Sequence, residues 1–126
     1  MVLALVDDLL FSSRIRAAAE RTGRPISFVR SRAALLPEIA KTRPDLVIID
    51  LDRESLDPIG AIRDVKSLAD GHAVPMVGFV SHVHADLIDA ARRAGCDQVL
   101  ARSAFVNRLP DLFAKARPDS PEPSRS

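Results

Sequence analysis

Short apolar runs recur along the chain, separated by longer stretches in which apolar and polar residues mix. The runs are rich in valine, isoleucine and leucine, and they cover residues 2–6, 26–29, 46–49, 76–80 and 99–100 with their neighbours. The third and fourth runs are almost continuously apolar. A strand that faced water on one side would alternate apolar with polar residues, so these runs indicate strands buried on both faces of a parallel sheet.

The stretches between the runs have the spacing of amphipathic helices, which we expect over residues 11–21, 32–41, 58–68, 85–93 and 105–116. Ser12 or Ser13 is expected to cap the first helix, and Ser31 the second. Pro37 predicts a kink or a late start in the second helix. Pro110 predicts that the regular part of the last helix begins only there.

This alternation of strand and helix predicts an α/β fold. Right-handed crossovers place helices on both faces of the sheet. For five strands the common doubly wound solution is the flavodoxin-like order 2-1-3-4-5, with its switch point between the first and third strands. We expect the domain to span residues 1–117, and the Pro- and Ser-rich residues 118–126 to form a disordered tail.

Composition narrows the classes of partner. The length of 126 residues fits a single domain, and 47% hydrophobic residues suffice for a core. A formal net charge of +1 gives no reason to expect a nucleic acid or an anionic membrane as partner. No stretch reaches the roughly 20 apolar residues that span a bilayer. The single Cys96 cannot form an internal disulfide, which suits a cytoplasmic location.

Carboxylates gather at the predicted carboxyl edge of the sheet. Asp7 and Asp8 end the first strand, Asp50 the third, Ser81 the fourth and Arg102 the fifth. Like charges this close favour a bound cation, and a ligand set of hard oxygens suits Mg²⁺ better than Zn²⁺. A partly buried carboxylate beside such a metal is a plausible nucleophile toward phosphorus. Single aspartates at strand ends also serve as caps or turn formers, but their convergence at one switch point favours a shared function.

Over about residues 2–116 the sequence resembles the receiver domain of bacterial two-component response regulators. The resemblance is carried by LALVDDLLFSSRI at the first strand, DLVIIDLDRESLDPIGAIRDV at the third, VPMVGFVS at the fourth and ARRAGCDQVLARSAF at the fifth. It implies that Asp50 accepts a phosphoryl group from a histidine kinase or another phosphodonor. It also implies no enzymatic activity beyond self-phosphorylation and slow self-dephosphorylation.

The same resemblance assigns roles to the other residues at this edge. Asp7 and Asp8 would hold Mg²⁺, with Asp50 and the backbone carbonyl of Asp52 completing the protein ligands. Ser81 and Arg102 would bind the phosphoryl oxygens. The phosphorylated chain would then relay a signal by contact with a downstream protein in a phosphorelay.

Several positions depart from the family pattern. Arg102 stands where the family keeps lysine, and Ser103 follows it in place of proline. His82 replaces a small residue after Ser81 and could crowd or tune the phosphoryl site. Val99 stands at the aromatic switch position of the fifth strand. These departures leave open a pseudo-receiver, a protein-interaction module that acts without phosphorylation.

Two further interpretations are weaker. His82 and His84 are two residues apart, but a zinc site needs further ligands. The D-L-D sequence at 50–52 resembles the first motif of haloacid-dehalogenase-like phosphatases. That family places the motif on its first strand, expects Thr or Val where Glu54 stands, and needs much more chain after it.

Overall fold

The computed structural model describes residues 1–68, 74–81 and 84–115. Its strands are β1 (Val2–Leu5), β2 (Ile26–Val29), β3 (Leu46–Asp50), β4 (Met76–Val80) and β5 (Gln98–Ala101). They form one sheet in the order β2-β1-β3-β4-β5, in which every neighbouring pair is parallel. The predicted fold and strand order are therefore confirmed.

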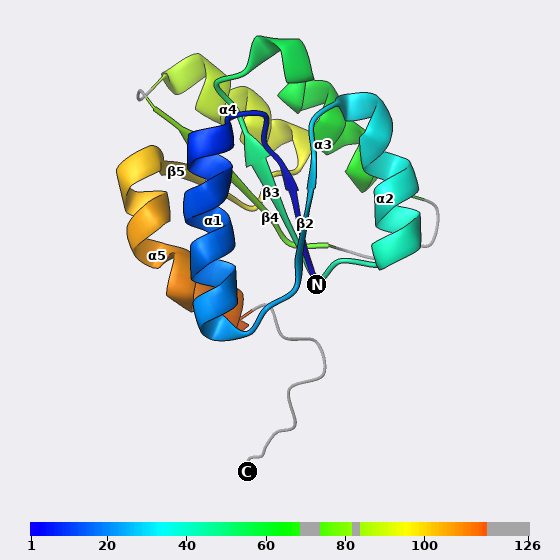
Figure 1. Ribbon diagram of the computed structural model, residues 1–126. Helices are drawn as coiled ribbons and strands as arrows, with labels where there is room; N and C mark the ends of the chain where they lie inside the picture. The colour runs from blue at the N-terminus through cyan, green and yellow to red at the C-terminus, as the bar shows by residue number, and fades with distance from the viewer. Residues whose placement is uncertain (69–73, 82–83, 116–126) are drawn as a thin grey trace.

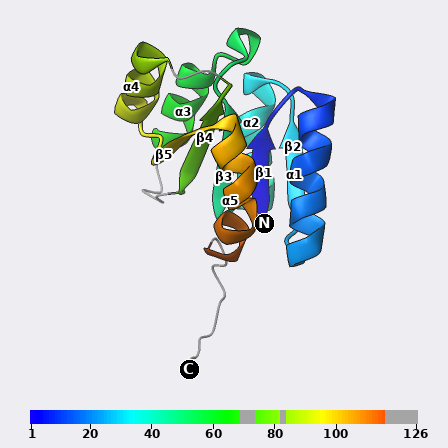
Figure 2. The same ribbon diagram turned by 90° about the vertical axis from the view of Figure 1, so that its left-hand side faces the viewer.

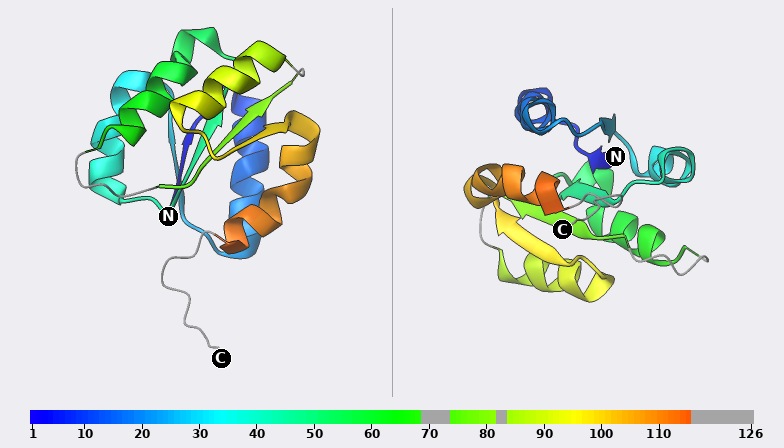
Figure 3. Two further views of the ribbon diagram at one scale, coloured as in Figure 1. Left: turned by 180° about the vertical axis from the view of Figure 1, so that it is seen from behind. Right: turned by 90° about the horizontal axis from the view of Figure 1, so that it is seen from below.

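Helices cover both faces of this sheet (Figure 1). They are α1 (Leu9–Thr22), α2 (Leu35–Thr42), α3 (Pro58–Lys66), α4 (Ala85–Ala94) and α5 (Arg102–Lys115), with short 3₁₀ turns at Arg32–Ala34 and Glu54–Leu56. Helices α1 and α5 lie side by side on one face (Figure 2), and α2, α3 and α4 cover the other (Figure 3). None of the described helices is long and apolar enough to cross a membrane.

The central strands divide their side chains between two cores. On β1, Leu3 and Leu5 join the core under α2, α3 and α4, whereas Val2 and Ala4 join the core under α1 and α5. Successive side chains of a strand point to opposite faces, so a strand covered on both sides must be apolar at every position. All residues of β3 and β4 are buried, which confirms the interpretation of their continuous apolar runs.

The first helix begins earlier than the sequence indicated, and a different residue caps it. Asp8, not Ser12 or Ser13, is its N-cap, and the Asp8 carboxylate accepts a hydrogen bond from the Phe11 amide at 3.1 Å. Ser12 lies inside the helix and is buried. An N-cap needs extended backbone, and Asp8 has it with φ −88° and ψ 114°. The expected serine caps of this helix were wrong.

The last helix also begins earlier than expected. It runs from Arg102 and passes through Pro110 without a break, so the prediction of a start at Pro110 was wrong. A proline inside a helix removes one backbone hydrogen bond. Leu109, Leu112 and Phe113 are buried against α1 and the sheet, and this packing outweighs the lost bond.

The second helix follows its prediction closely. Ser31 caps the 3₁₀ turn by accepting a hydrogen bond from the Ala34 amide at 3.2 Å. The α-helix starts late, at Leu35, which places Pro37 in its first turn. The missing N–H of a proline costs nothing there. Two other predictions, the tail at 118–126 and the position of His82, fall outside the described residues.

Candidate functional site

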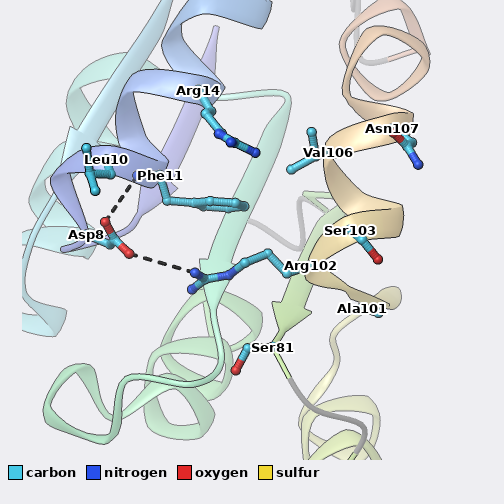
Figure 4. A pocket seen from close by; sticks show the side chains of 10 residues that line it. All are labelled: Asp8, Leu10, Phe11, Arg14, Ser81, Ala101, Arg102, Ser103, Val106 and Asn107. Carbon is cyan, nitrogen blue, oxygen red and sulfur yellow. Dashed lines mark hydrogen bonds and ion pairs between the residues drawn. The ribbon is translucent and has the colours of Figure 1, made fainter.

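The carboxyl ends of the strands meet at one edge, where a pocket of about 670 Å³ opens between the starts of α1 and α5 (Figure 4). Of the residues predicted for this edge, Asp8, Ser81 and Arg102 line the pocket together. Asp7 follows β1 beside Asp8, and Asp50 is the last residue of β3. The full lining is Asp8, Leu10, Phe11, Arg14, Ser81, Ala101, Arg102, Ser103, Val106 and Asn107.

Asp50 is the most deeply placed carboxylate of the edge, with 2% of its surface exposed. Its Oδ1 accepts a hydrogen bond from the Asp52 amide at 2.9 Å. Burial raises the pKa of Asp50, and this effect is opposed in part by that hydrogen bond and by the charges of Arg102 and Arg53. A buried, more basic carboxylate held in a fixed orientation is suited to attack an electrophile.

The residue after Asp50 fixes the direction of the loop. Leu51 is buried, and its amide donates to the Phe79 carbonyl of β4 at 3.0 Å. Its side chain packs closely on Gly78, where an added Cβ would lie only 2.7 Å from Leu51 Cδ1. Glycine on β4 therefore makes room for Leu51, and Leu51 in turn holds Asp52 against the edge.

Within the part of the chain that the structure describes, the Asp8 carboxylate has two partners. Its Oδ1 caps α1, and its Oδ2 lies 3.8 Å from Nη1 of Arg102 (Figure 4). A carboxylate at a helix N-terminus is stabilised by the unpaired amides and the helix dipole. The cap therefore orients Asp8 so that its second oxygen faces Arg102.

Asp7 pairs with a different arginine. Its Oδ2 lies 3.5 Å from Nη2 of Arg53, and both side chains are well exposed. The neighbouring aspartates Asp7 and Asp8 are thus divided between two arginines. The sequence interpretation gave Arg53 no role.

The guanidinium of Arg102 packs on the rings of Phe11 and Phe79, which we call the aromatic shelf. Its guanidinium carbon is 4.4 Å from the centroid of the Phe11 ring and 5.5 Å from that of Phe79. The two rings, 4.7 Å apart, belong to a buried cluster with Phe105. The ring faces attract the cation and hold it over the pocket. The sequence analysis did not identify either phenylalanine as part of the site. Their only signal was position, because Phe11 lies in the first turn of α1 and Phe79 near the end of β4.

Arg102 contacts its carboxylate partners by charge attraction and not by directional hydrogen bonds. Its closest carboxylate oxygens, on Asp8 and Asp52, lie at 3.8 and 3.7 Å, beyond ordinary hydrogen-bond length. Its Nε is buried, with no hydrogen-bond partner among the described residues. The guanidinium is therefore shared between two carboxylates and can be drawn to either.

The side chain of Asp52 has a place in the site that the sequence did not indicate. Its Oδ2 accepts a hydrogen bond from the backbone amide of Ser81 at 2.7 Å and faces Nη2 of Arg102 at 3.7 Å. Only the backbone carbonyl of Asp52 had been predicted to act. Asp52 thus joins the ends of β3, β4 and β5.

The fit to Mg²⁺ is good in chemistry but incomplete in arrangement. Asp7, Asp8 and Asp50 offer the hard oxygens that Mg²⁺ prefers. However, within residues 1–68, 74–81 and 84–115 no group of three or more Asp, Glu, His or Cys side chains lies close enough to hold a metal ion. Asp7 faces Arg53 and Asp8 faces Arg102, so a metal would have to compete with these two cations.

Besides Arg102, two more departures from the family pattern lie within the described residues. Val99 is partly buried on β5 and packs against the core under α2, α3 and α4. Ser103 is exposed in the first turn of α5 and lines the pocket.

No protein-family model matches the sequence, and no curated protein matches it. Solved structures do. The chain is similar to a response regulator from Hahella chejuensis, with a TM-score of 0.81 at 21% identity, over 94% of this chain and 95% of that one. It is similar to the phosphorylated cyanobacterial phytochrome response regulator RcpA, with a TM-score of 0.80 at 15% identity, over 98% and 97%.

A third similar structure is the receiver domain of the sensor histidine kinase PA1611 from Pseudomonas aeruginosa, which has a magnesium ion coordinated in its active-site cleft. Its TM-score is 0.74 at 19% identity, over 90% of this chain and 96% of that one. At these identities the likeness establishes the fold, which is that of receiver domains.

Proposed function

We propose that this chain acts as a response-regulator receiver, taking a phosphoryl group onto Asp50 and passing the signal on by protein contact. The observation that carries the proposal is the buried carboxylate of Asp50 at the end of β3, beside the switch point of the sheet. Ligands of doubly wound sheets bind at this point. The fold shared with the phosphorylated regulator RcpA supports the same assignment.

The chemistry follows from the environment of Asp50. A carboxylate oxygen attacks phosphorus of a phosphohistidine or a small acyl phosphate; the new O–P bond forms as the bond to the leaving group breaks, and the leaving imidazole or carboxylate takes the electron pair. The Asp52 amide orients the carboxylate through its hydrogen bond to Oδ1. Burial keeps water from the nucleophile and makes it more basic.

Ser81 and Arg102 supply the groups that would bind the phosphoryl oxygens. Both line the pocket beyond β4 and β5, and Arg102 brings a permanent positive charge. Mg²⁺, held by Asp7, Asp8, Asp50 and the Asp52 carbonyl, would neutralise charge on the transferring group. The phosphodonor would be a histidine kinase or a small phosphorylated molecule, and the receiver of the signal a downstream protein.

Mass spectrometry after treatment with acetyl phosphate and Mg²⁺ tests this proposal. We expect a species heavier by one phosphoryl group in the native chain and in Asp86→Asn, which removes an exposed carboxylate from the first turn of α4. We expect no such species in Asp50→Asn. Modification that persists in Asp50→Asn, or its absence from the native chain, would contradict the assignment.

A second function is favoured by one specific observation. Arg102 already bridges Asp8 and Asp52, so the pocket is neutralised in part by the chain itself. A pseudo-receiver, which acts as an interaction module without phosphorylation, would keep this arrangement permanently. Amide NMR with Mg²⁺ and beryllofluoride separates the two functions, because only a working receiver shows shifts that extend from Asp50 toward Arg102 and α5.

A further inference from the structure

The Asp52 carboxylate occupies the position between the two groups expected to bind phosphoryl oxygens. It accepts the Ser81 amide at 2.7 Å and faces the Arg102 guanidinium at 3.7 Å. An amide and a guanidinium directed at one point form an anion-binding pair. In this structure the anion they hold belongs to the protein.

The same residue is also tied to the nucleophile. The Asp52 backbone amide donates to Oδ1 of Asp50, two residues earlier. Leu51 between them is buried and hydrogen-bonded to β4, so the fold fixes the backbone of residues 50–52 while the Asp52 side chain keeps its own rotamers. An anion on Asp50 would therefore develop within reach of the groups that Asp52 holds.

We propose that Asp52 is a positioning residue whose carboxylate serves as the resident anion of the phosphoryl-binding groups, and that a phosphoryl group on Asp50 must displace it. This inference rests on the proposed function. Both anions need the Ser81 amide and the Arg102 guanidinium, and two anions so close repel each other. Displacement frees the Asp52 side chain and gives Ser81 and Arg102 a new acceptor.

The arrangement of Arg102 makes the exchange feasible. Its guanidinium rests on Phe11 and Phe79 and touches Asp52 only at 3.7 Å, so it can keep its aromatic contacts while its anionic partner changes. The Asp52 side chain is about one quarter exposed, with a relative surface of 27%, so it can leave toward water. The amide of Ser81 is the first backbone group after β4, and it would report the change of acceptor directly.

Binding of two phosphoryl mimics to Asp52→Asn tests the inference. Beryllofluoride with Mg²⁺ reports on an anion attached to Asp50, and inorganic phosphate reports on the anion-binding pair alone; both are titrated by amide NMR. We expect Asp52→Asn to bind at least one of them about tenfold more tightly than the native chain. The matched control is Glu54→Gln, which removes an exposed carboxylate from the same loop and should bind like the native chain.

The outcomes separate this inference from the proposed function. Tighter beryllofluoride binding by Asp52→Asn than by the native chain supports both the resident anion and the receiver function. If the native chain and Asp52→Asn bind beryllofluoride with the same affinity, and also bind phosphate with the same affinity, the resident anion is overturned but the receiver function is not. Phosphate binding gained by Asp52→Asn, with no beryllofluoride binding in either chain, supports the resident anion and contradicts the receiver function.

If neither beryllofluoride nor phosphate binds to the native chain or to Asp52→Asn, the resident anion and the receiver function are both overturned. Chemical denaturation confirms that each variant is folded, and Asp52→Ala replaces Asp52→Asn if the amide side chain itself binds Ser81. A gain seen equally in Glu54→Gln would show that only the net charge of the loop matters, and would also overturn the inference.

Discussion

The two ends of the sheet each place an arginine against aspartate, and the two arrangements differ in what they can do. At the amino end Arg24 pairs with Asp45, and both side chains are nearly buried. At the carboxyl end Arg102 is shared by Asp8 and Asp52, and the three side chains are between one quarter and about one third exposed. In the first cluster one carboxylate, that of Asp45, lies between two cations, Arg24 and the Met1 amino group at 3.6 Å, whereas in the second one cation is divided between two carboxylates.

The two ends of the sheet also differ in their balance of positive and negative groups. At the carboxyl end the four carboxylates of Asp7, Asp8, Asp50 and Asp52 lie near three guanidinium groups, those of Arg53, Arg102 and the pocket-lining Arg14, which leaves an excess of one negative charge if all are ionised. At the amino end one carboxylate, that of Asp45, meets two cations, the Arg24 guanidinium and the Met1 amino group. A nearly buried ion pair holds strands in place, whereas accessible charge shared among several partners binds a ligand.

The largest expected effect comes from breaking the Arg24–Asp45 pair. Asp45→Ala takes the Asp45 partner from a guanidinium that is only 7% exposed, so we expect a loss of about 3 kcal/mol in the free energy of unfolding. Urea denaturation measures it. The control Asp89→Ala, which breaks the exposed pair with Arg93 on α4, should cost less than about 0.5 kcal/mol. Similar losses in the two variants would contradict the distinction.

The next effect concerns the shared cation. Arg102→Met removes the group that competes with a metal for Asp8, so we expect the affinity for Mg²⁺ to rise about tenfold, measured by amide NMR titration. Arg93→Met, which changes net charge equally but far along α4, should leave the affinity unchanged. An unchanged or weaker affinity in Arg102→Met would show that Arg102 does not compete with the metal.

A smaller effect tests the aromatic shelf. A double-mutant cycle between Phe11→Leu and Arg102→Met should give a coupling of about 0.5 to 1 kcal/mol, the usual strength of a cation over a ring. The same cycle with Phe113→Leu, a buried residue of α5, should be additive. Additivity in both cycles would mean that the ring serves only as core packing.

The smallest change is a pH dependence centred on Asp50. Because burial raises its pKa in the folded state, the ionised form destabilises the fold, and that cost disappears once Asp50 is protonated. Asp50→Asn should therefore be more stable than the native chain at neutral pH. The difference should shrink as pH falls and vanish below about 4, where both folded and unfolded chains are protonated. A difference that is constant with pH would contradict the raised pKa.

The sequence was sufficient to predict the fold because its patterns repeat along the chain. Continuous apolar runs at β3 and β4 and the regular return of helical spacing each point to the same parallel sheet. The strand ends then follow, and with them the gathering of Asp8, Asp50, Ser81 and Arg102 at one edge. Pro110 was misjudged because its local effect is outweighed by the burial of Leu109 and Phe113, which only the tertiary structure provides.

The contacts inside the site could not be predicted in the same way. Whether Asp52 turns its carboxylate to Ser81, and whether Asp7 pairs with Arg53 or with Arg102, depends on competition among side chains of similar charge and reach. Small differences in distance decide such competition, and residue order does not encode them. The role of Asp8 as a helix cap was predictable in principle from its place before Leu9, but the serines that follow offered an equally good signal.

The double use of Asp8 links the pocket to the local stability of α1. One oxygen of Asp8 closes the first turn of the helix and the other faces Arg102, so any change in what Asp8 binds alters the strength of that cap. The same turn carries Leu9 and Leu10, which are 62% and 83% exposed. The fraying of this turn is therefore thermodynamically coupled to the contents of the pocket, and hydrogen exchange at the Phe11 amide would measure that coupling in units of free energy.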